Sequence, residues 1–214
     1  MLHVIDTVLF DFDGTLVEIN IDFDQMRRGV TSLGLEYGVS SEPGLYVLES
    51  LESIFEELLR CDARRAGKFR QQAEKLIVDI EMEAISGSRA MPGADKALRE
   101  LKDRGLKVGI VTRNCRSAVM KAAEMAGFVY DLMLTRDDVE KVKPDPQHLL
   151  DALSLLGSGP EKALMIGDHP MDILAGKRAG MKTAAVLTSK SFEDFEEVAP
   201  DMVLPGVAEL LRML

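Results

Sequence analysis

The residues most suited to chemistry are two aspartates, Asp11 and Asp13, in the run Asp11-Phe12-Asp13-Gly14-Thr15. They directly follow a short apolar run, so they stand where a buried strand would end, and ligand sites in open parallel sheets lie at that end. Two carboxylates at this spacing can face one cation, and the glycine lets the backbone turn sharply behind them. An ordinary acidic surface turn is the alternative, because Asp-Gly pairs are common turn formers.

Two further polar positions suggest binding of an anion. Thr112 ends another apolar run and precedes Arg113 and Asn114. A threonine hydroxyl and backbone N–H groups at a helix start can hold a phosphate oxygen, although Thr112 would equally serve as an ordinary N-cap. Lys143, within the run 141–146, can neutralise a phosphoryl charge or orient a carboxylate. Its alternative is a surface lysine before a helix that begins at a proline.

A second pair of acids, Asp168 and Asp172, follows a third apolar run. If a helix begins here, residues four apart share one face and both carboxylates can serve a hard cation. The alternative is acidity at a helix N-terminus, which complements the helix dipole. The three histidines, His3, His148 and His169, show no metal-ligand spacing, and we expect all three in loops or at the surface.

These polar positions need a scaffold, and an alternation of strand and helix patterns supplies one. Apolar runs predict strands over 7–10, 106–112, 163–167 and 183–187, with weaker candidates over 132–134 and 202–204. Helical patterns over 94–104 and 116–126 lie between them, and Gly127 stands where a helix C-cap is expected. Continuous apolar strands that alternate with helices predict an α/β fold whose parallel sheet is covered by helices.

The stretch 18–89 has a different texture, because it contains no convincing strand. Apolar residues recur at helical spacing from Leu45 to Leu59 and again from Phe69 to Ala84. We therefore expect an all-helical domain over 18–89, inserted into a core domain made of 1–17 and 90–214. Basic clusters at 27–28 and 64–68 either face a site or are solvated helix surface.

Composition restricts the class of protein. The chain has 214 residues, of which 46% are hydrophobic and 29% charged, and its net charge is −10. This composition argues against disorder, and the negative charge disfavours a nucleic-acid or anionic-membrane partner. No secretory signal or membrane-length apolar run is visible. The two cysteines form no CxxC pair, so we expect neither a disulfide scaffold nor a zinc site. We expect a cytoplasmic location.

Taken in order, the four motifs form a known pattern. The segment 11–15, Thr112, Lys143 and the segment 168–172 match DxDGT, then Thr or Ser, then Lys, then GDxxxD. By these residues the sequence resembles the haloacid dehalogenase-like (HAD) hydrolase superfamily, and within it the phosphatases with a helical cap. Phosphoglycolate phosphatases are the nearest-looking subgroup. The resemblance implies a Rossmann-like core with the inserted helical domain as its cap.

The resemblance also implies roles for the catalytic residues. Asp11 would be the nucleophile that forms an aspartyl-phosphate, and Asp13 would protonate the leaving group and then activate water. Thr112 and Lys143 would hold the transferring phosphoryl oxygens. The residues implied to bind the substrate are Phe12, Arg113 and Asn114.

For the metal, the resemblance implies Mg²⁺ bound by the Asp11 carboxylate, the Asp13 backbone carbonyl and Asp168. Asp172 would position Asp168, Lys143 or a metal-bound water. The expected substrate is a small phosphorylated metabolite, such as phosphoglycolate or a sugar phosphate. The protein is expected as a monomer or homodimer without nucleic-acid or membrane partners.

Several other activities compete with this expectation. A haloacid dehalogenase lacks an acid at the position of Asp13, so this residue counts against it. A phosphonatase needs a cap lysine for a Schiff base, for which Lys68 and Lys75 are available. A phosphomutase keeps both aspartates and stays open. A non-catalytic regulatory module is disfavoured by the intact set of site residues.

Overall fold

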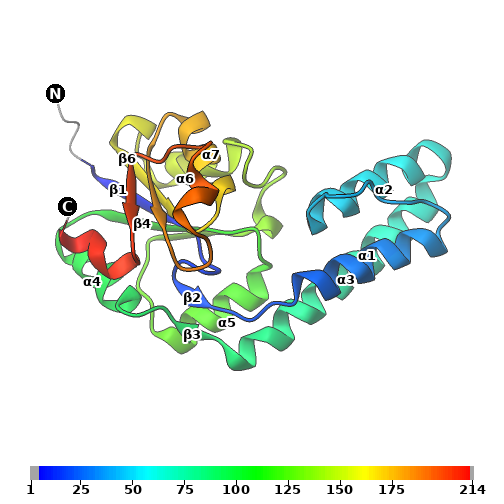
Figure 1. The fold of residues 1–214 in the computed structure, drawn as a ribbon, viewed down its shortest axis with the longest axis horizontal. Helices are drawn as coiled ribbons and strands as arrows, with labels where there is room; N and C mark the ends of the chain where they lie inside the picture. The colour runs from blue at the N-terminus through cyan, green and yellow to red at the C-terminus, as the bar shows by residue number, and fades with distance from the viewer. Residues whose placement is uncertain (1–4, 213–214) are drawn as a thin grey trace. The chain divides into compact units, whose positions relative to one another are not determined.

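The structure is a computed structural model that describes residues 5–212. The chain divides into two compact units, and the first comprises Met1–Ile19 with Gly87–Leu214. The second comprises Asn20–Ser86. We name them the core unit and the cap unit, and Figure 1 labels their elements.

A six-stranded sheet with the order β5-β4-β1-β6-β7-β8 forms the centre of the core unit. All of its neighbouring strands pair in parallel. The strands are β1 (Thr7–Phe10), β4 (Lys107–Val111), β5 (Leu132–Leu134), β6 (Ala163–Gly167), β7 (Lys182–Val186) and β8 (Met202–Leu204). At the carboxyl end of β1, Phe10 lies opposite Ile110 of β4 and Ile166 of β6. The next residues of the three strands therefore lie together at one edge of the sheet, the edge at which ligand sites of open parallel sheets are found.

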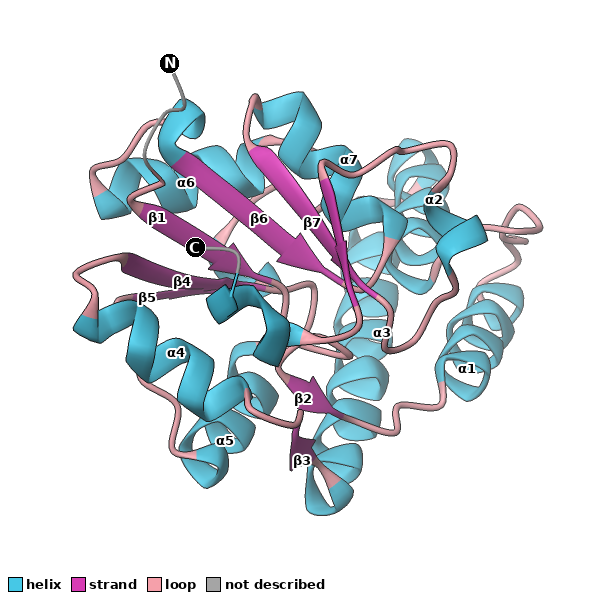
Figure 2. Ribbon diagram, turned by 60° about the vertical axis from the view of Figure 1, so that its left-hand side comes forward, coloured by secondary structure: helices cyan, strands magenta, loops and turns pink. Residues whose placement is uncertain are grey.

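Helices cover the sheet, as Figure 2 shows, and they make the predicted α/β fold with a parallel sheet. They are α4 (Ala94–Asp103), α5 (Arg116–Ala126), α6 (Gln147–Leu156) and α7 (Pro170–Ala179). Leu9 of β1 packs in one apolar cluster with Leu149 of α6 and Ala175 of α7. Helix α5 ends at Gly127, whose φ of 64° is left-handed, so the predicted C-cap is confirmed.

The cap unit consists of three helices, α1 (Phe23–Glu36), α2 (Val47–Cys61) and α3 (Ala63–Ala84). Their apolar faces share a cluster that includes Val30 of α1, Ile54 of α2 and Phe69 of α3, all fully buried. The helical spacing found in the sequence thus corresponds to α2 and α3. Asp22 caps α1 by accepting the Gln25 N–H at 2.7 Å.

A short antiparallel pair of strands lies where the chain leaves and re-enters the core unit. Strand β2 (Val17–Glu18) pairs with β3 (Arg89–Ala90). The expectation of no strand over 18–89 is therefore wrong at both ends of that stretch. Two-residue strands are too short to show any periodicity, and they form because two distant segments return side by side.

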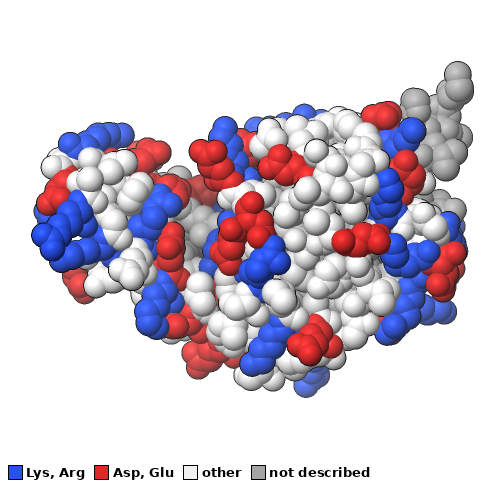
Figure 3. Space-filling view, turned by 180° about the vertical axis from the view of Figure 1, so that it is seen from behind, with Lys and Arg blue, Asp and Glu red and all other residues white. Residues whose placement is uncertain are grey.

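The remaining regular elements are short 3₁₀ helices. They are η1 (Ile85–Gly87), η2 (Arg136–Asp138), η3 (Pro160–Lys162), η4 (Phe192–Phe195) and η5 (Val207–Arg212). Within residues 5–212, no helix has both the length and the apolar character that crossing a membrane requires. Acidic and basic side chains are interspersed on the face drawn in Figure 3.

Candidate active site

The loop that follows β1 is built around a tight turn. Gly14 has a φ of 82°, and a Cβ added there would lie 2.1 Å from Oδ2 of Asp168. Glycine is needed both for the left-handed backbone and for this close approach. The carbonyl of Phe12 accepts the N–H groups of Leu16 at 2.9 Å and Val17 at 3.0 Å. The Phe12 ring is fully buried and packs edge-on against Phe128, so the loop is anchored in the core unit.

Three carboxylates meet above this loop. Oxygen atoms of Asp11, Asp168 and Asp172 all lie within 4.8 Å of one another, and all three residues are buried. They come from the ends of β1 and β6 and from the first turn of α7. An acidic surface turn at Asp11 and a surface position for Lys143 are both wrong, because Asp11 is only 8% exposed and Lys143 only 1%.

Lys143 is the cation of this cluster. Its Nζ donates to Asp11 Oδ1 at 2.6 Å and to Asp172 Oδ1 at 2.7 Å. The other oxygen of Asp172 accepts the backbone N–H of His169 at 3.1 Å, in a capping box at the start of α7. Of the partners considered for Asp172, the geometry thus identifies Lys143.

Asp13 has a separate set of partners, which come from the end of β4. Its Oδ1 accepts Nδ2 of Asn114 at 2.8 Å, and its Oδ2 accepts Oγ1 of Thr112 at 3.1 Å. The Thr112 hydroxyl also accepts the backbone N–H of Asn114 at 3.0 Å. Helix α5 begins after Cys115, so Thr112 is not its N-cap.

Two hydroxyl groups hold Asp168. Thr15 shares its single hydroxyl proton between Asp168 Oδ1, at 3.2 Å, and Asp11 Oδ2, at 3.3 Å. Ser189, in the loop after β7, donates to Asp168 Oδ2 and to the Asp168 backbone carbonyl. Ser189 is not among the residues predicted from the sequence, because a single serine in a polar loop carries no recognisable pattern.

Burial and the neighbouring charges shift the pKa values of the residues in this cluster. Burial disfavours the ammonium form of Lys143, but the charges of Asp11 and Asp172 outweigh burial and raise its pKa. Burial, reinforced by Asp11 and Asp172, raises the pKa of Asp168 to about 8. Burial also raises the pKa of Asp172 to about 6, although Lys143 opposes the shift. Lys143 contacts Asp11 and Asp172 but not Asp168, so a further cation would relieve the repulsion among the three carboxylates.

The donor set fits a magnesium ion. Mg²⁺ prefers oxygen ligands and is commonly held by one or two carboxylates. Asp11 and Asp168 supply such oxygens, and a carboxylate oxygen that accepts one hydrogen bond keeps a second lone pair for a cation. Asp172 lies in the same cluster and is bonded to Lys143 and to the N–H of His169.

The side chain of Arg113 links two parts of the site. Its Nη1 lies 3.0 Å from the carbonyl oxygen of Lys143 and 2.6 Å from Sδ of Met171. His169 caps α7, since its Nδ1 accepts the Met171 N–H at 3.2 Å. His148 is fully buried on α6, so the expectation of a loop or surface position is wrong for this histidine. His3 lies outside the described residues.

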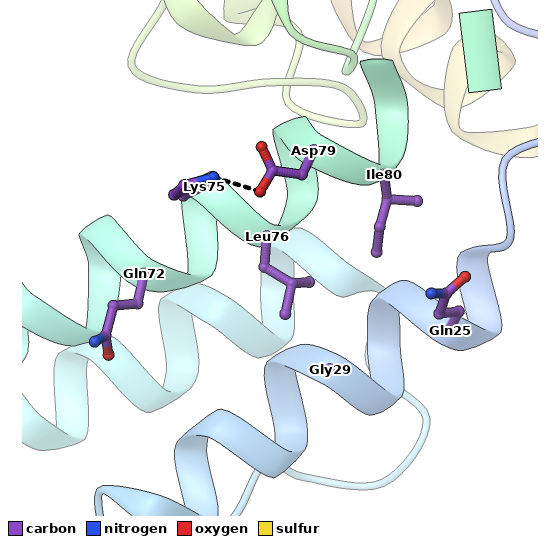
Figure 4. Close-up of a pocket in the computed structure, with 7 residues that line it drawn as sticks. All are labelled: Gln25, Gly29, Gln72, Lys75, Leu76, Asp79 and Ile80. Carbon is purple, nitrogen blue, oxygen red and sulfur yellow. Dashed lines mark hydrogen bonds and ion pairs between the residues drawn. The ribbon is translucent and has the colours of Figure 1, made fainter. Parts of the chain in front are cut away.

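The cap unit contains a hollow of its own, between α1 and α3 (Figure 4). Its volume is about 420 Å³, and it is lined by Gln25, Gly29, Gln72, Lys75, Leu76, Asp79 and Ile80. Lys75 forms an ion pair with Asp79 at 2.5 Å on the rim. Of the predicted basic clusters, Arg65 donates to the carbonyl of Tyr37 at 2.8 Å, so its charge is used within the cap unit.

Comparisons with known proteins agree with the motifs. The family model described as haloacid dehalogenase-like hydrolase matches residues 8–186. Pyrophosphatase PpaX of Bacillus cereus (strain AH820) is 35% identical over 219 residues, covering 98% of this chain and 96% of the relative. PpaX of Bacillus cereus (strain B4264) is 34% identical over 218 residues, with the same coverage.

Solved structures with low sequence identity share the fold. A β-phosphoglucomutase from Clostridium difficile superimposes with a TM-score of 0.70 at 19% identity, covering 97% of this chain and 93% of that one. A predicted phosphoglycolate phosphatase from Haemophilus somnus 129pt gives a TM-score of 0.68 at 18% identity, covering 98% and 97%. These structures support the fold alone, whereas the family match and the pyrophosphatase relatives cover most of the sequence. The chain belongs to the haloacid dehalogenase-like hydrolases.

Proposed function

We propose that the protein is a Mg²⁺-dependent phosphoric ester hydrolase that acts on a small phosphorylated molecule through a covalent phosphate on Asp11. The observation that carries the proposal is the different environment of its two motif aspartates. Asp11 lies in the buried cluster and contacts Lys143, whereas Asp13 contacts Thr112 and Asn114. One carboxylate is therefore suited to attack and the other to proton transfer.

In the first step, a carboxylate oxygen of Asp11 attacks phosphorus, and the bond from phosphorus to the leaving oxygen breaks. Asp13, entering in its protonated form, gives its proton to that oxygen. In the second step, Asp13 takes a proton from water as the water oxygen attacks the phosphorus of the aspartyl-phosphate. The phosphorus–oxygen bond to Asp11 breaks, so phosphate leaves and both aspartates return to their starting states.

Lys143 neutralises the phosphoryl oxygens during both steps. Its contacts with Asp11 and Asp172 keep it charged, because both carboxylates raise its pKa. The Thr112 hydroxyl, once it turns from Asp13 to the substrate, and the backbone N–H groups near Phe12 and Arg113 would supply hydrogen-bond donors, while the Asn114 N–H holds the Thr112 oxygen. Mg²⁺, held by Asp11, Asp168 and the Asp13 backbone carbonyl, would screen the phosphoryl charge.

Inorganic pyrophosphate is a candidate substrate beside the esters, as an anhydride whose leaving group is phosphate, because the relatives named pyrophosphatase match 98% of this chain. Phosphoglycolate and sugar phosphates are the other candidates. All of them present the same phosphoryl group to the core unit, so preference among them must come from residues outside the four motifs. We assign that selection to the cap unit.

The test is a comparison of phosphate release from pyrophosphate, phosphoglycolate and glucose 1-phosphate by the purified protein with Mg²⁺. We expect kcat/KM for one of the three to exceed the others and chelation to abolish turnover. Asp11→Asn is the matched control, since it removes the nucleophile and changes volume little. Equal release by Asp11→Asn, or full activity in excess chelator, would contradict the proposal. Conversion of a sugar phosphate to an isomer, without phosphate release, would indicate a phosphomutase.

A further inference from the structure

The loop after β7 contacts both parts of the proposed metal site, although none of its residues belongs to the four motifs. Thr188 donates its hydroxyl to the carbonyl of Gly14 at 2.5 Å, in the loop after β1. Ser189 donates to the carboxylate and the backbone carbonyl of Asp168, in the loop after β6. Two adjacent hydroxyls therefore join three loops of the core unit at the edge where Asp11 lies.

The contact of Ser189 completes the hydrogen bonding of Asp168. Thr15 donates to Oδ1 of that carboxylate at 3.2 Å, and Ser189 donates to Oδ2. The same Oδ2 faces Gly14, where an added Cβ would lie 2.1 Å away. A carboxylate rotates easily about its last bond, so donors on opposite oxygens, together with the close packing of Oδ2 against Gly14, fix its plane.

Orientation matters for this carboxylate, because Mg²⁺ demands near-ideal octahedral geometry. Groups that hydrogen-bond to a metal ligand tune its affinity, and their removal typically costs about 10–100-fold. Each donated proton occupies one lone pair of an Asp168 carboxylate oxygen, so each oxygen keeps a second lone pair that can bind the cation.

We propose that Ser189 is a positioning residue for the metal site, holding the Asp168 carboxylate in the orientation that binds Mg²⁺. This inference rests on the proposed function, because it takes Asp168 as a ligand. Ser189 is exposed, whereas its partner Asp168 is buried. Substitutions there are therefore expected to leave the folded core unit intact.

The test measures the affinity of the full chain for Mg²⁺ by titration calorimetry. We expect Ser189→Ala to weaken Mg²⁺ binding by about 10-fold or more. Ser189→Thr should bind within about 3-fold of the wild type, since it keeps the hydroxyl. Ser191→Ala is the matched control, because that hydroxyl lies two residues further along and bonds to Asp194 at 3.0 Å. It should bind Mg²⁺ as the wild type does.

A kinetic readout separates positioning from general damage. For Ser189→Ala, the Mg²⁺ concentration at half-maximal rate should rise, while kcat at saturating Mg²⁺ returns to near the wild-type value. A loss of kcat at every Mg²⁺ concentration, or unchanged or tighter Mg²⁺ binding, would overturn the inference.

Asp168→Asn distinguishes this failure from failure of the proposed function. If Asp168→Asn loses Mg²⁺ binding and Ser189→Ala does not, Asp168 is a ligand and the role of Ser189 is wrong. If Asp168→Asn binds Mg²⁺ as tightly as the wild type, the proposed metal site is itself wrong and the inference falls with it.

Discussion

Asp11 and Asp13 carry the same functional group, and their neighbours make them different. Lys143 contacts one oxygen of Asp11 at 2.6 Å, while Asp13 accepts from Asn114 and Thr112 at 2.8 and 3.1 Å. The types and spacing of these residues predict a site, but they do not reveal which donor each carboxylate meets. That assignment needs the three-dimensional positions of strands far apart in the sequence.

Asp13→Asn should lower kcat by roughly 10²–10⁴, which is the usual contribution of general acid–base catalysis. The loss should be larger for an alkyl phosphate than for p-nitrophenyl phosphate, because nitrophenolate leaves without needing a proton. Steady-state rates on both esters, at saturating Mg²⁺, measure the difference. An equal loss on both esters would argue that Asp13 has only a structural role.

His148 is a residue that sequence reasoning misplaced. It lies fully buried on α6, and burial, with the nearby charge of Lys143, lowers its pKa to about 3. Its residue type is common at surfaces, and the apolar pattern of α6 does not reveal that a polar ring fills a core position.

This burial makes a prediction about pH. The unfolded state binds a proton near pH 6.5 and the native state does not, so stability is lost as pH falls below 6.5 toward 3. The cost at pH 5 is about 2 kcal/mol. Between pH 7 and pH 5, His148→Leu should therefore lose less free energy of unfolding than the wild type, by about that amount. The free energies are measured by urea unfolding of both proteins at pH 7 and pH 5. An equal loss in the two proteins would contradict the prediction.

At the scale of elements, the sequence best predicts the strands that are buried on both faces of the sheet. The runs over 7–10 and 163–167 coincide with β1 and β6, because strands covered by helices on either side have no position that faces solvent. Strands β2 and β3 could not be predicted, since each has only two residues. The contact of Ser189 could not be predicted for a different reason, because it joins two loops that are 21 residues apart in the sequence.

A substitution at Gly14 tests whether the turn after β1 is needed for metal binding. Gly14→Ala places a methyl group against Asp168 and strains a left-handed backbone, so Mg²⁺ binding and activity should fall by at least about 10-fold. Gly127→Ala is the matched control: its φ is also positive, and the nearest atom to an added Cβ, on Arg99, is 3.6 Å away. Both variants should lose about 1–2 kcal/mol of stability, but only Gly14→Ala should lose metal binding. Equal effects on Mg²⁺ affinity would reduce Gly14 to an ordinary turn residue.

At the scale of the whole molecule, our proposal places the chemistry in one unit and the selection of substrate in the other. The family motifs all lie in the core unit, whereas the cap unit is a helical body with its own apolar cluster. The family, the fold class and the assignment as a hydrolase agree with what the sequence predicts. The substrate does not follow from the motifs, because they address only the phosphoryl group.

If the cap unit selects the substrate, its basic residues should influence KM. Replacing Arg27 and Arg28 on α1 with alanine should raise KM for a substrate with a second anionic group by about 10-fold, the value of one charge-assisted hydrogen bond. The KM for p-nitrophenyl phosphate should change little. Equal loss on both substrates would indicate damage to folding, and no change on either would mean that the pair is solvated surface.

The covalent phosphate on Asp11 is the claim on which the proposed mechanism depends. Rapid quenching of the wild type with its best substrate, followed by borohydride reduction and mass spectrometry, locates an acyl phosphate as a homoserine residue. We predict that reduction at position 11, and its absence in Asp11→Asn. A phosphoryl group mapped to any other residue, or turnover that leaves Asp11 unmodified at every quench time, would contradict the account.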